Sequence, residues 1–255
     1  MVLTDTHTHI YLSELRADIS ALMQRAHDKN IKRFFLPNID LDSIDDVFSL
    51  SALYPNECYP MMGLHPCSVK ENYTDVLEEI KKHIDKPGVV AIGEIGIDLY
   101  WDKSTLEIQK DAFRMQIRWA KERKLPIVIH AREAFQKIYD ILSEEKDENL
   151  RGVFHCFTGS LEQANLISNL GFYLGIGGVL TYKNAGLPEV IKHVDMKHII
   201  LETDSPYLTP VPHRGKPNES SYLIHVAEKL AEVKKISLEE VAEITTANSK
   251  ILFGI

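Results

Sequence analysis

Short runs of β-branched and other apolar residues alternate along this chain with longer stretches whose apolar residues recur every three or four positions. The first pattern predicts buried strands and the second predicts amphipathic helices. The expected strands are Val2–His9, Lys32–Pro37, Tyr59–His65, Val89–Ile95, Pro126–His130, Gly152–Phe157, Gly171–Gly175 and Ile199–Asp204. Because each return between parallel strands needs a crossover, this alternation predicts a parallel sheet.

The clearest helical stretches are Leu15–Lys29, Leu106–Lys124 and Leu161–Leu170, and two more, Asn218–Val233 and Leu238–Phe253, close the chain. Ser237, followed three residues later by Glu240, predicts a capping box at the start of the last helix. No linker rich in Gly or Ser interrupts the pattern, so we expect one domain over residues 1–255.

Eight strand–helix units in a chain of 255 residues predict an α/β fold, a single (β/α)₈ TIM barrel with its site at the C-terminal ends of the strands. An open, doubly wound sheet is the alternative. It is disfavoured because no G-x-G-x-x-G motif follows the first strand.

Composition narrows the class of protein. The chain is 44% hydrophobic with a formal net charge of −8, which argues against a broad nucleic-acid-binding surface but not against a cleft that takes one strand end. There is no leader pattern and no apolar run of about 20 residues, so we expect no membrane association. Cys58, Cys67 and Cys156 lack C-x-x-C spacing, which favours reduced thiols and a cytoplasmic location. We expect Cys156 to point away from the site, into the helix layer.

The sequence His7-Thr8-His9 ends the first expected strand. Alternate residues of a strand share a face, so the two imidazoles point the same way and can chelate a divalent metal. A His-x-His pair also occurs in ordinary loops. The interpretation therefore depends on which polar residues the other strands carry at the same end.

Those other strand ends carry His65, Glu94, His130, His155 and Asp204. A barrel brings the C-terminal ends of all its strands to one mouth. Unpaired polar groups gathered there would carry a desolvation cost, and coordination of metal ions removes that cost. The sequence therefore predicts a metal centre at the mouth.

Six ligands exceed the three protein ligands of a typical catalytic zinc and suit two ions about 3.5–4 Å apart. We expect Glu94 to bridge them, because its strand lies midway between the two groups of histidines. The predicted metal ligands are His7, His9 and Asp204 for one ion, His130 and His155 for the other, and Glu94 for both. A water between such ions has a lowered pKa and becomes a nucleophile. Asp204 is then placed to accept its proton and pass it to the leaving group, so Asp204 and Glu94 are the predicted catalytic residues.

Residues near these strand ends are candidates for binding substrate. Arg132 and Arg214 are the expected phosphate clamps, because a guanidinium fork matches phosphate oxygens. Three readings of His65 stay open: contact with a substrate phosphate, support of a ligand, or a purely structural place in a tight Leu-His-Pro turn. Glu202 shares the inward face of Asp204, and we expect it to orient a ligand imidazole. The aromatic side chains that could stack a base are Tyr100, Trp101 and Tyr207.

Seven motifs, taken together and in order, resemble the TatD family of metal-dependent deoxyribonucleases, within the amidohydrolase-like barrels. They are DTHTH at 5–9, GLHP at 63–66, GEIGID at 93–98, PIVIHAR at 126–132, FHCFTG at 154–159, ETDSPYL at 202–208 and PVPHRGKPNE at 210–219. The resemblance implies a two-metal TIM barrel that hydrolyses DNA phosphodiester bonds, including 3′-to-5′ exonuclease action. It also implies metal-ligand roles for the same six residues.

The partner expected from this resemblance is DNA, as single strands or ends, with no membrane and no obligate protein partner. The two divalent ions are Zn²⁺, Mn²⁺, Ni²⁺ or Mg²⁺. Imidazole ligands favour the first three, whereas the family points to Mg²⁺, which prefers oxygen ligands. One alternative is hydrolysis of an amide, ester or aminoacyl linkage by the same centre. Another is a metal-holding binding module without turnover. Glu94 stands where related barrels carry a carboxylated lysine, which disfavours the lactonase and phosphotriesterase branches.

Overall fold

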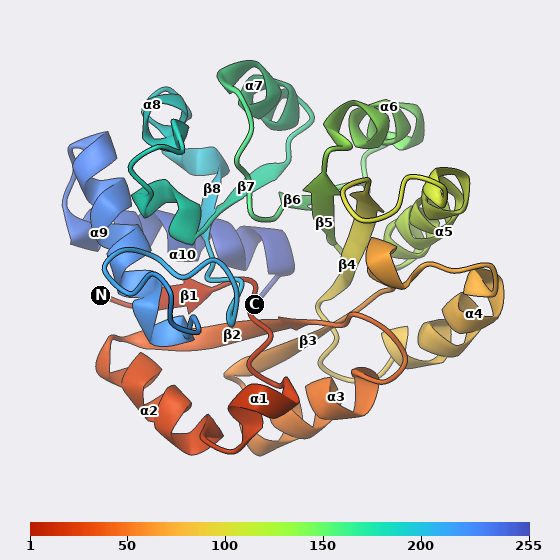
Figure 1. Cartoon of the computed structure of the whole chain (residues 1–255), viewed down its shortest axis with the longest axis horizontal. Helices are drawn as coiled ribbons and strands as arrows, with labels where there is room; N and C mark the ends of the chain where they lie inside the picture. The colour runs from red at the N-terminus through yellow and green to blue at the C-terminus, as the bar shows by residue number, and fades with distance from the viewer.

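All eight expected strands are present in the computed structural model, which describes residues 1–255, and they pair in parallel and in chain order (Figure 1). Their bounds are β1 Leu3–Asp5, β2 Ile31–Pro37, β3 Cys58–Met62, β4 Ala91–Asp98, β5 Ile127–Arg132, β6 Gly152–Phe154, β7 Tyr173–Ile176 and β8 Ile199–Leu201. The predicted TIM barrel is therefore confirmed, and the open doubly wound alternative is excluded.

Segments that follow β1 and β8 close the barrel. The Thr6 N–H donates to the carbonyl of Leu201 at 3.0 Å, and the Asp204 N–H donates to the carbonyl of His7 at 2.9 Å. A parallel bridge between Thr8 and Ser205 continues the contact. The backbone on which two expected metal ligands sit is thus fixed by the barrel's own hydrogen bonds.

The helices form an outer ring around the strands (Figure 1). They are α1 Ser13–Arg16, α2 Ile19–Asp28, α3 Ile44–Leu53, α4 Tyr73–Ile84, α5 Leu106–Arg123, α6 Phe135–Glu145, α7 Leu161–Asn169, α8 Leu187–Ile191, α9 Leu223–Lys234 and α10 Leu238–Phe253. Short 3₁₀ turns are η1 Pro66–Ser68, η2 Gly178–Thr181, η3 Met196–His198 and η4 Ser220–Tyr222. None of these helices combines the length and the apolar character that crossing a bilayer requires.

Two hydrophobic clusters hold the barrel together. The larger, of 56 buried residues, fills the space between the strands and the helices. The smaller lies where Leu252 and Phe253 of α10 meet strand residues such as Phe35, Val128 and Ile200. The expected capping box at Ser237 and Glu240 starts α10, and the end of that helix packs against this smaller cluster.

Two predicted helices have different bounds in the structure. The stretch expected as one helix from residue 15 to 29 is divided into α1 and α2 at Asp18, whose φ of −110° leaves the helical region. The helix expected from Asn218 begins only at Leu223. The Asn218 side-chain amide instead donates to the carbonyls of Thr203 and Tyr207, which ties this segment to the loop after β8.

Candidate metal centre

Four donor atoms from three barrel strands form a first group. His7 and His9 follow β1, Glu94 lies on β4 and Asp204 follows β8, and all four are buried. Nε2 of His7 lies 3.2 Å from Nε2 of His9, 3.2 Å from Oε2 of Glu94 and 3.7 Å from Oδ1 of Asp204. Nε2 of His9 lies 3.6 Å from the same Glu94 oxygen and 3.5 Å from the same Asp204 oxygen. Donors about 2.0–2.1 Å from a tetrahedral ion lie about 3.4 Å from one another, so this group fits one divalent cation.

A second group faces the other oxygen of the same glutamate. Oε1 of Glu94 lies 2.8 Å from Nδ1 of His130, 2.8 Å from Nε2 of His155 and 3.3 Å from Nε2 of His65. Nδ1 of His130 lies 3.3 Å from Nε2 of His65 and 3.4 Å from Nε2 of His155. These distances also match those between donor atoms that surround a single metal ion. The structure therefore places His65 among the donor atoms, a position that none of the readings left open by the sequence specified.

The Glu94 carboxylate joins the two groups, with one oxygen in each. The imidazole rings of His7 and His155, one from each group, stack with their centroids 4.0 Å apart. Bridged ion pairs in metalloenzymes are separated by about 3.5–4 Å. The donor set and its spacing thus fit two divalent cations that share one carboxylate.

The electrostatics of the cluster favour an ionised Glu94. Burial alone would raise the pKa of this carboxyl, but the surrounding histidines, His155 foremost, hold it well below its usual range. Burial lowers the pKa of His7, and repulsion from a charged His155 adds to this effect. Metal binding needs deprotonated carboxylates and neutral imidazoles. The environment therefore keeps the Glu94 carboxylate deprotonated and favours a neutral imidazole at His7.

Two neighbouring side chains orient ligand rings by hydrogen bonds. The Tyr11 hydroxyl donates to the carbonyl of Pro37 at 2.6 Å, so it accepts a hydrogen bond from Nδ1 of His9 at 2.9 Å, which leaves Nε2 free. Asp98 accepts from Nε2 of His130 at 2.9 Å. Fixing the second nitrogen of a ligand histidine in this way sets its tautomer and its direction. Glu202 accepts from the Cys156 N–H, and its Oε1 lies 3.7 Å from Nδ1 of His155, beyond hydrogen-bond distance.

Sequence reasoning missed Asp98 as a site residue. It lies at the end of β4, which extends three residues beyond the expected end at Ile95, and it is buried. Its position four residues after Glu94 places it on the same face of the strand. The alternation Glu94, Gly96, Asp98 was the signal that could have identified it.

A cavity of about 680 Å³ opens over both donor groups. Arg132, Trp101 and Tyr207 line it, as expected for residues that contact substrate. The guanidinium carbon of Arg132 lies 3.7 Å from the ring centre of Tyr100, and the Trp101 side chain is 72% exposed at the rim. The volume lies within the usual range of small-ligand sites, about 300–1,000 Å³.

One expected phosphate-binding residue lies in a different cavity, and one expectation about side-chain direction does not match the structure. Arg214 does not line this cavity and lies beside Tyr182 in a separate one. Cys156 lines the metal cavity instead of pointing into the helix layer. The reason is that β6 ends at Phe154 and Cys156 has a φ of +50°, so strand alternation no longer applies there.

Comparison with known proteins gives an independent result. The family model described as TatD related DNase matches residues 4–254. YabD of Bacillus subtilis, an uncharacterized metal-dependent hydrolase, is 42% identical over all of both chains. YcfH of Escherichia coli, which carries the same description, is 34% identical over all of this chain and 97% of its own. The crystal structure of YjjV, a TatD homologue from Escherichia coli, superimposes with a TM-score of 0.94 at 29% identity, covering 99% of this chain and 98% of the other.

Proposed function

This chain belongs to the TatD family of metal-dependent hydrolases, and we propose that it cleaves DNA phosphodiester bonds, removing nucleotides from the 3′ end of a strand. The observation that carries the proposal is the division of the Glu94 carboxylate between two donor groups. Two-ion centres of this kind are common in phosphatases and nucleases, because they stabilise both the attacking and the leaving oxygen.

The residues present define which cations the site would hold. His7, His9 and Asp204 would hold one ion, His130 and His155 with His65 beside them the other, and Glu94 both. Once bound, such ions polarise a phosphoryl oxygen and lower the pKa of water. The number of imidazole donors favours Zn²⁺, Mn²⁺ or Ni²⁺ over Mg²⁺, which prefers oxygen ligands.

Asp204 is the proposed general base. It lines the cavity, and its Oδ1 lies 3.5 Å from Nε2 of His9. Burial would raise the pKa of this carboxyl, but the neighbouring imidazoles of His9, His155 and His7 lower it, so the group is ionised. An ionised carboxylate at this place can take the proton of the attacking water. It can then deliver that proton to the leaving sugar oxygen as the P–O bond breaks.

The rim of the cavity would hold the substrate strand. Arg132 offers a guanidinium fork for a phosphate, and its stacking on Tyr100 limits its movement. Trp101 and Tyr207 are exposed aromatic residues that also line the cavity, and such side chains stack bases in proteins that bind single strands. These roles complete a site for a nucleotide at a strand end.

The test compares three substrates on the same metal-reconstituted protein: 3′-labelled single-stranded DNA, bis(p-nitrophenyl) phosphate and an aminoacyl ester. We expect turnover of the two phosphodiesters, loss of this turnover in Asp204→Asn, and no turnover of the ester. Robust ester hydrolysis with intact DNA would favour the acyl-hydrolase alternative. Intact substrates throughout, even with excess protein and added Mn²⁺, would favour a binding module.

A further inference from the structure

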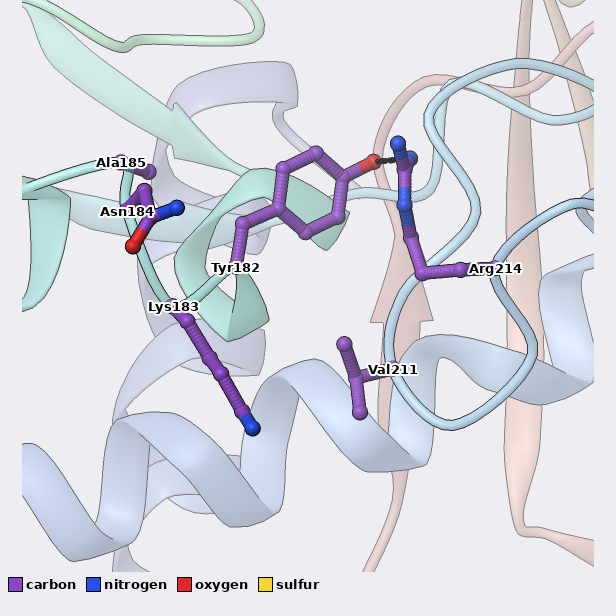
Figure 2. Close-up of a pocket in the computed structure, with 6 residues that line it drawn as sticks. All are labelled: Tyr182, Lys183, Asn184, Ala185, Val211 and Arg214. Atoms are coloured by element: carbon purple, nitrogen blue, oxygen red, sulfur yellow. Dashed lines mark hydrogen bonds between the residues drawn. The ribbon is translucent and has the colours of Figure 1, made fainter.

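Figure 2 shows the residues of a second cavity, of about 390 Å³. It is lined by two segments, one following η2 and the other in the loop that follows β8. The lining residues are Tyr182, Lys183, Asn184, Ala185, Val211 and Arg214. Nothing in the proposed metal chemistry uses this cavity.

The same two segments of the chain line both cavities. Val179 and Leu208 line the metal cavity, and the residues three positions later on each segment, Tyr182 and Val211, line the second. Three residues span at most about 11 Å, so the cavities are close neighbours. The two segments also meet directly, because a Cβ on Gly178 would lie only 2.0 Å from the carbonyl oxygen of Leu208. A strand that occupies both cavities therefore crosses this contact on its solvent side.

Arg214 is held in place before any ligand binds. Its Nη1 donates to the Tyr182 hydroxyl, as Figure 2 shows, and that hydroxyl donates to the carbonyl of Thr209 at 3.1 Å. The guanidinium carbon lies 4.0 Å from the ring centre of Tyr182. Because a guanidinium has five N–H donors, those on Nη2 and Nε remain available for an anion.

The cavity carries positive charge that no acid neutralises. Neither Arg214 nor Lys183 forms an ion pair with a carboxylate, and both side chains are exposed. A guanidinium that is held against an aromatic ring and has free N–H donors suits an anion with a flat, apolar part.

We propose that this second cavity binds the nucleotide next to the one that is cleaved. Tyr182 provides the stacking surface for its base, and Arg214 contacts its phosphate. Single-strand-binding proteins combine these same two features, aromatic platforms and cationic grooves. This inference rests on the proposed action on DNA, and it makes Arg214 a binding residue one nucleotide away from the metals.

The test measures two variants, Arg214→Gln and Tyr182→Leu, against Lys250→Gln, which removes an exposed positive charge on α10. Fluorescence anisotropy gives the affinity for a labelled single strand without requiring cleavage. Steady-state kinetics compares an oligonucleotide with bis(p-nitrophenyl) phosphate, which has no second nucleotide. We expect both variants to bind the strand at least about tenfold more weakly than the control. We also expect their KM for the oligonucleotide to rise about tenfold relative to that for the small diester. Thermal melts establish that each variant is folded.

The possible failures are distinguishable. If the wild type degrades DNA and both folded variants bind and cleave it as Lys250→Gln does, the second nucleotide site is refuted while the deoxyribonuclease proposal stands. If the wild type neither binds nor cleaves single-stranded DNA in the presence of metal, both proposals are refuted. Equal rises in KM for both substrates would also refute the second site, because they would place Arg214 and Tyr182 at the scissile group.

Discussion

Nε2 of His130 lies 2.9 Å from Oδ2 of Asp98, while Nδ1 of the same ring faces Glu94 at 2.8 Å. Burial alone would lower the pKa of His130, but its hydrogen bonds to the Asp98 and Glu94 carboxylates raise it. When the ring is neutral, the Asp98 carboxylate keeps the remaining proton on Nε2 and directs the lone pair of Nδ1 toward the second donor group. Asp98 acts through His130 and is a positioning residue.

Replacement of Asp98 by asparagine removes the charge that makes His130 a stronger ligand. We expect metal affinity at the second donor group to fall about 10- to 100-fold, the usual effect of losing such a partner. Calorimetric titration with metal measures this affinity. We also expect kcat/KM at limiting metal concentration to fall in parallel. Asp102→Asn, at an exposed position four residues later, is the matched control. If Asp98→Asn binds metal with the affinity of the wild type, Asp98 is not a positioning residue.

Replacement of His130 itself by alanine should leave the barrel folded, because the ring lines the cavity and is not part of either hydrophobic cluster. We expect hydrolysis to fall by at least about 100-fold, since losing a ligand costs at least as much as losing its partner. Circular dichroism checks the fold, and turnover of the small phosphodiester checks the activity. A folded variant with full activity would reject the second donor group.

Two glycines beside Glu202 provide a steric test of its role. A Cβ on Gly175 would lie 2.2 Å from Oε2 of Glu202, whereas a Cβ on Gly177 would lie 3.4 Å from its nearest neighbour, the Glu202 carbonyl oxygen. Gly175→Ala should displace the Glu202 carboxylate, which also accepts from the Cys156 N–H, and overpacking of this kind costs about 1–3 kcal/mol. We expect lower stability and activity for Gly175→Ala and near-normal values for Gly177→Ala. Equal behaviour of the two variants would argue against a role for Glu202 in holding His155.

The ion pair between Arg25 and Glu219 links α2 to the segment before α9. Nε of Arg25 lies 2.9 Å from Oε1 of Glu219, and Nη2 lies 2.6 Å from Oε2. Burial would raise the pKa of Glu219, but the hydrogen bonds from Arg25 and Ser221 lower it. Its stabilising contribution is therefore present above its ordinary pKa near 4.5 and is lost as the pH falls through the lower, folded-state value.

We accordingly expect Glu219→Gln to lower the free energy of unfolding by about 1 kcal/mol at neutral pH, a modest figure because Arg25 is half exposed. The difference from the wild type should shrink as the pH drops below 4.5. Urea unfolding at several pH values measures it, with Glu71→Gln as an exposed control. A difference that grows on acidification would contradict the assigned pKa direction.

The sequence predicted the barrel because its strands are short apolar runs, and their polar ends converge in the only way a parallel barrel allows. The same rule correctly predicted that His7, Glu94 and His130 lie close together. It does not predict side-chain placement where the backbone leaves the strand. Cys156 has a positive φ and points into the cavity, and Arg214 lies ten residues beyond Asp204 in a loop whose path depends on hydrogen bonds to Tyr182 and Thr209. Side-chain direction in such loops is set by tertiary contacts, which alternation does not encode.

The central claim is that Glu94 joins two cation sites, and metal content tests it most directly. Elemental analysis of purified, metal-reconstituted protein should give two equivalents per chain for the wild type and one for His130→Ala. It should give close to none for a folded Glu94→Ala variant. A wild type that binds a single equivalent, or a Glu94→Ala variant that retains two, would contradict the account.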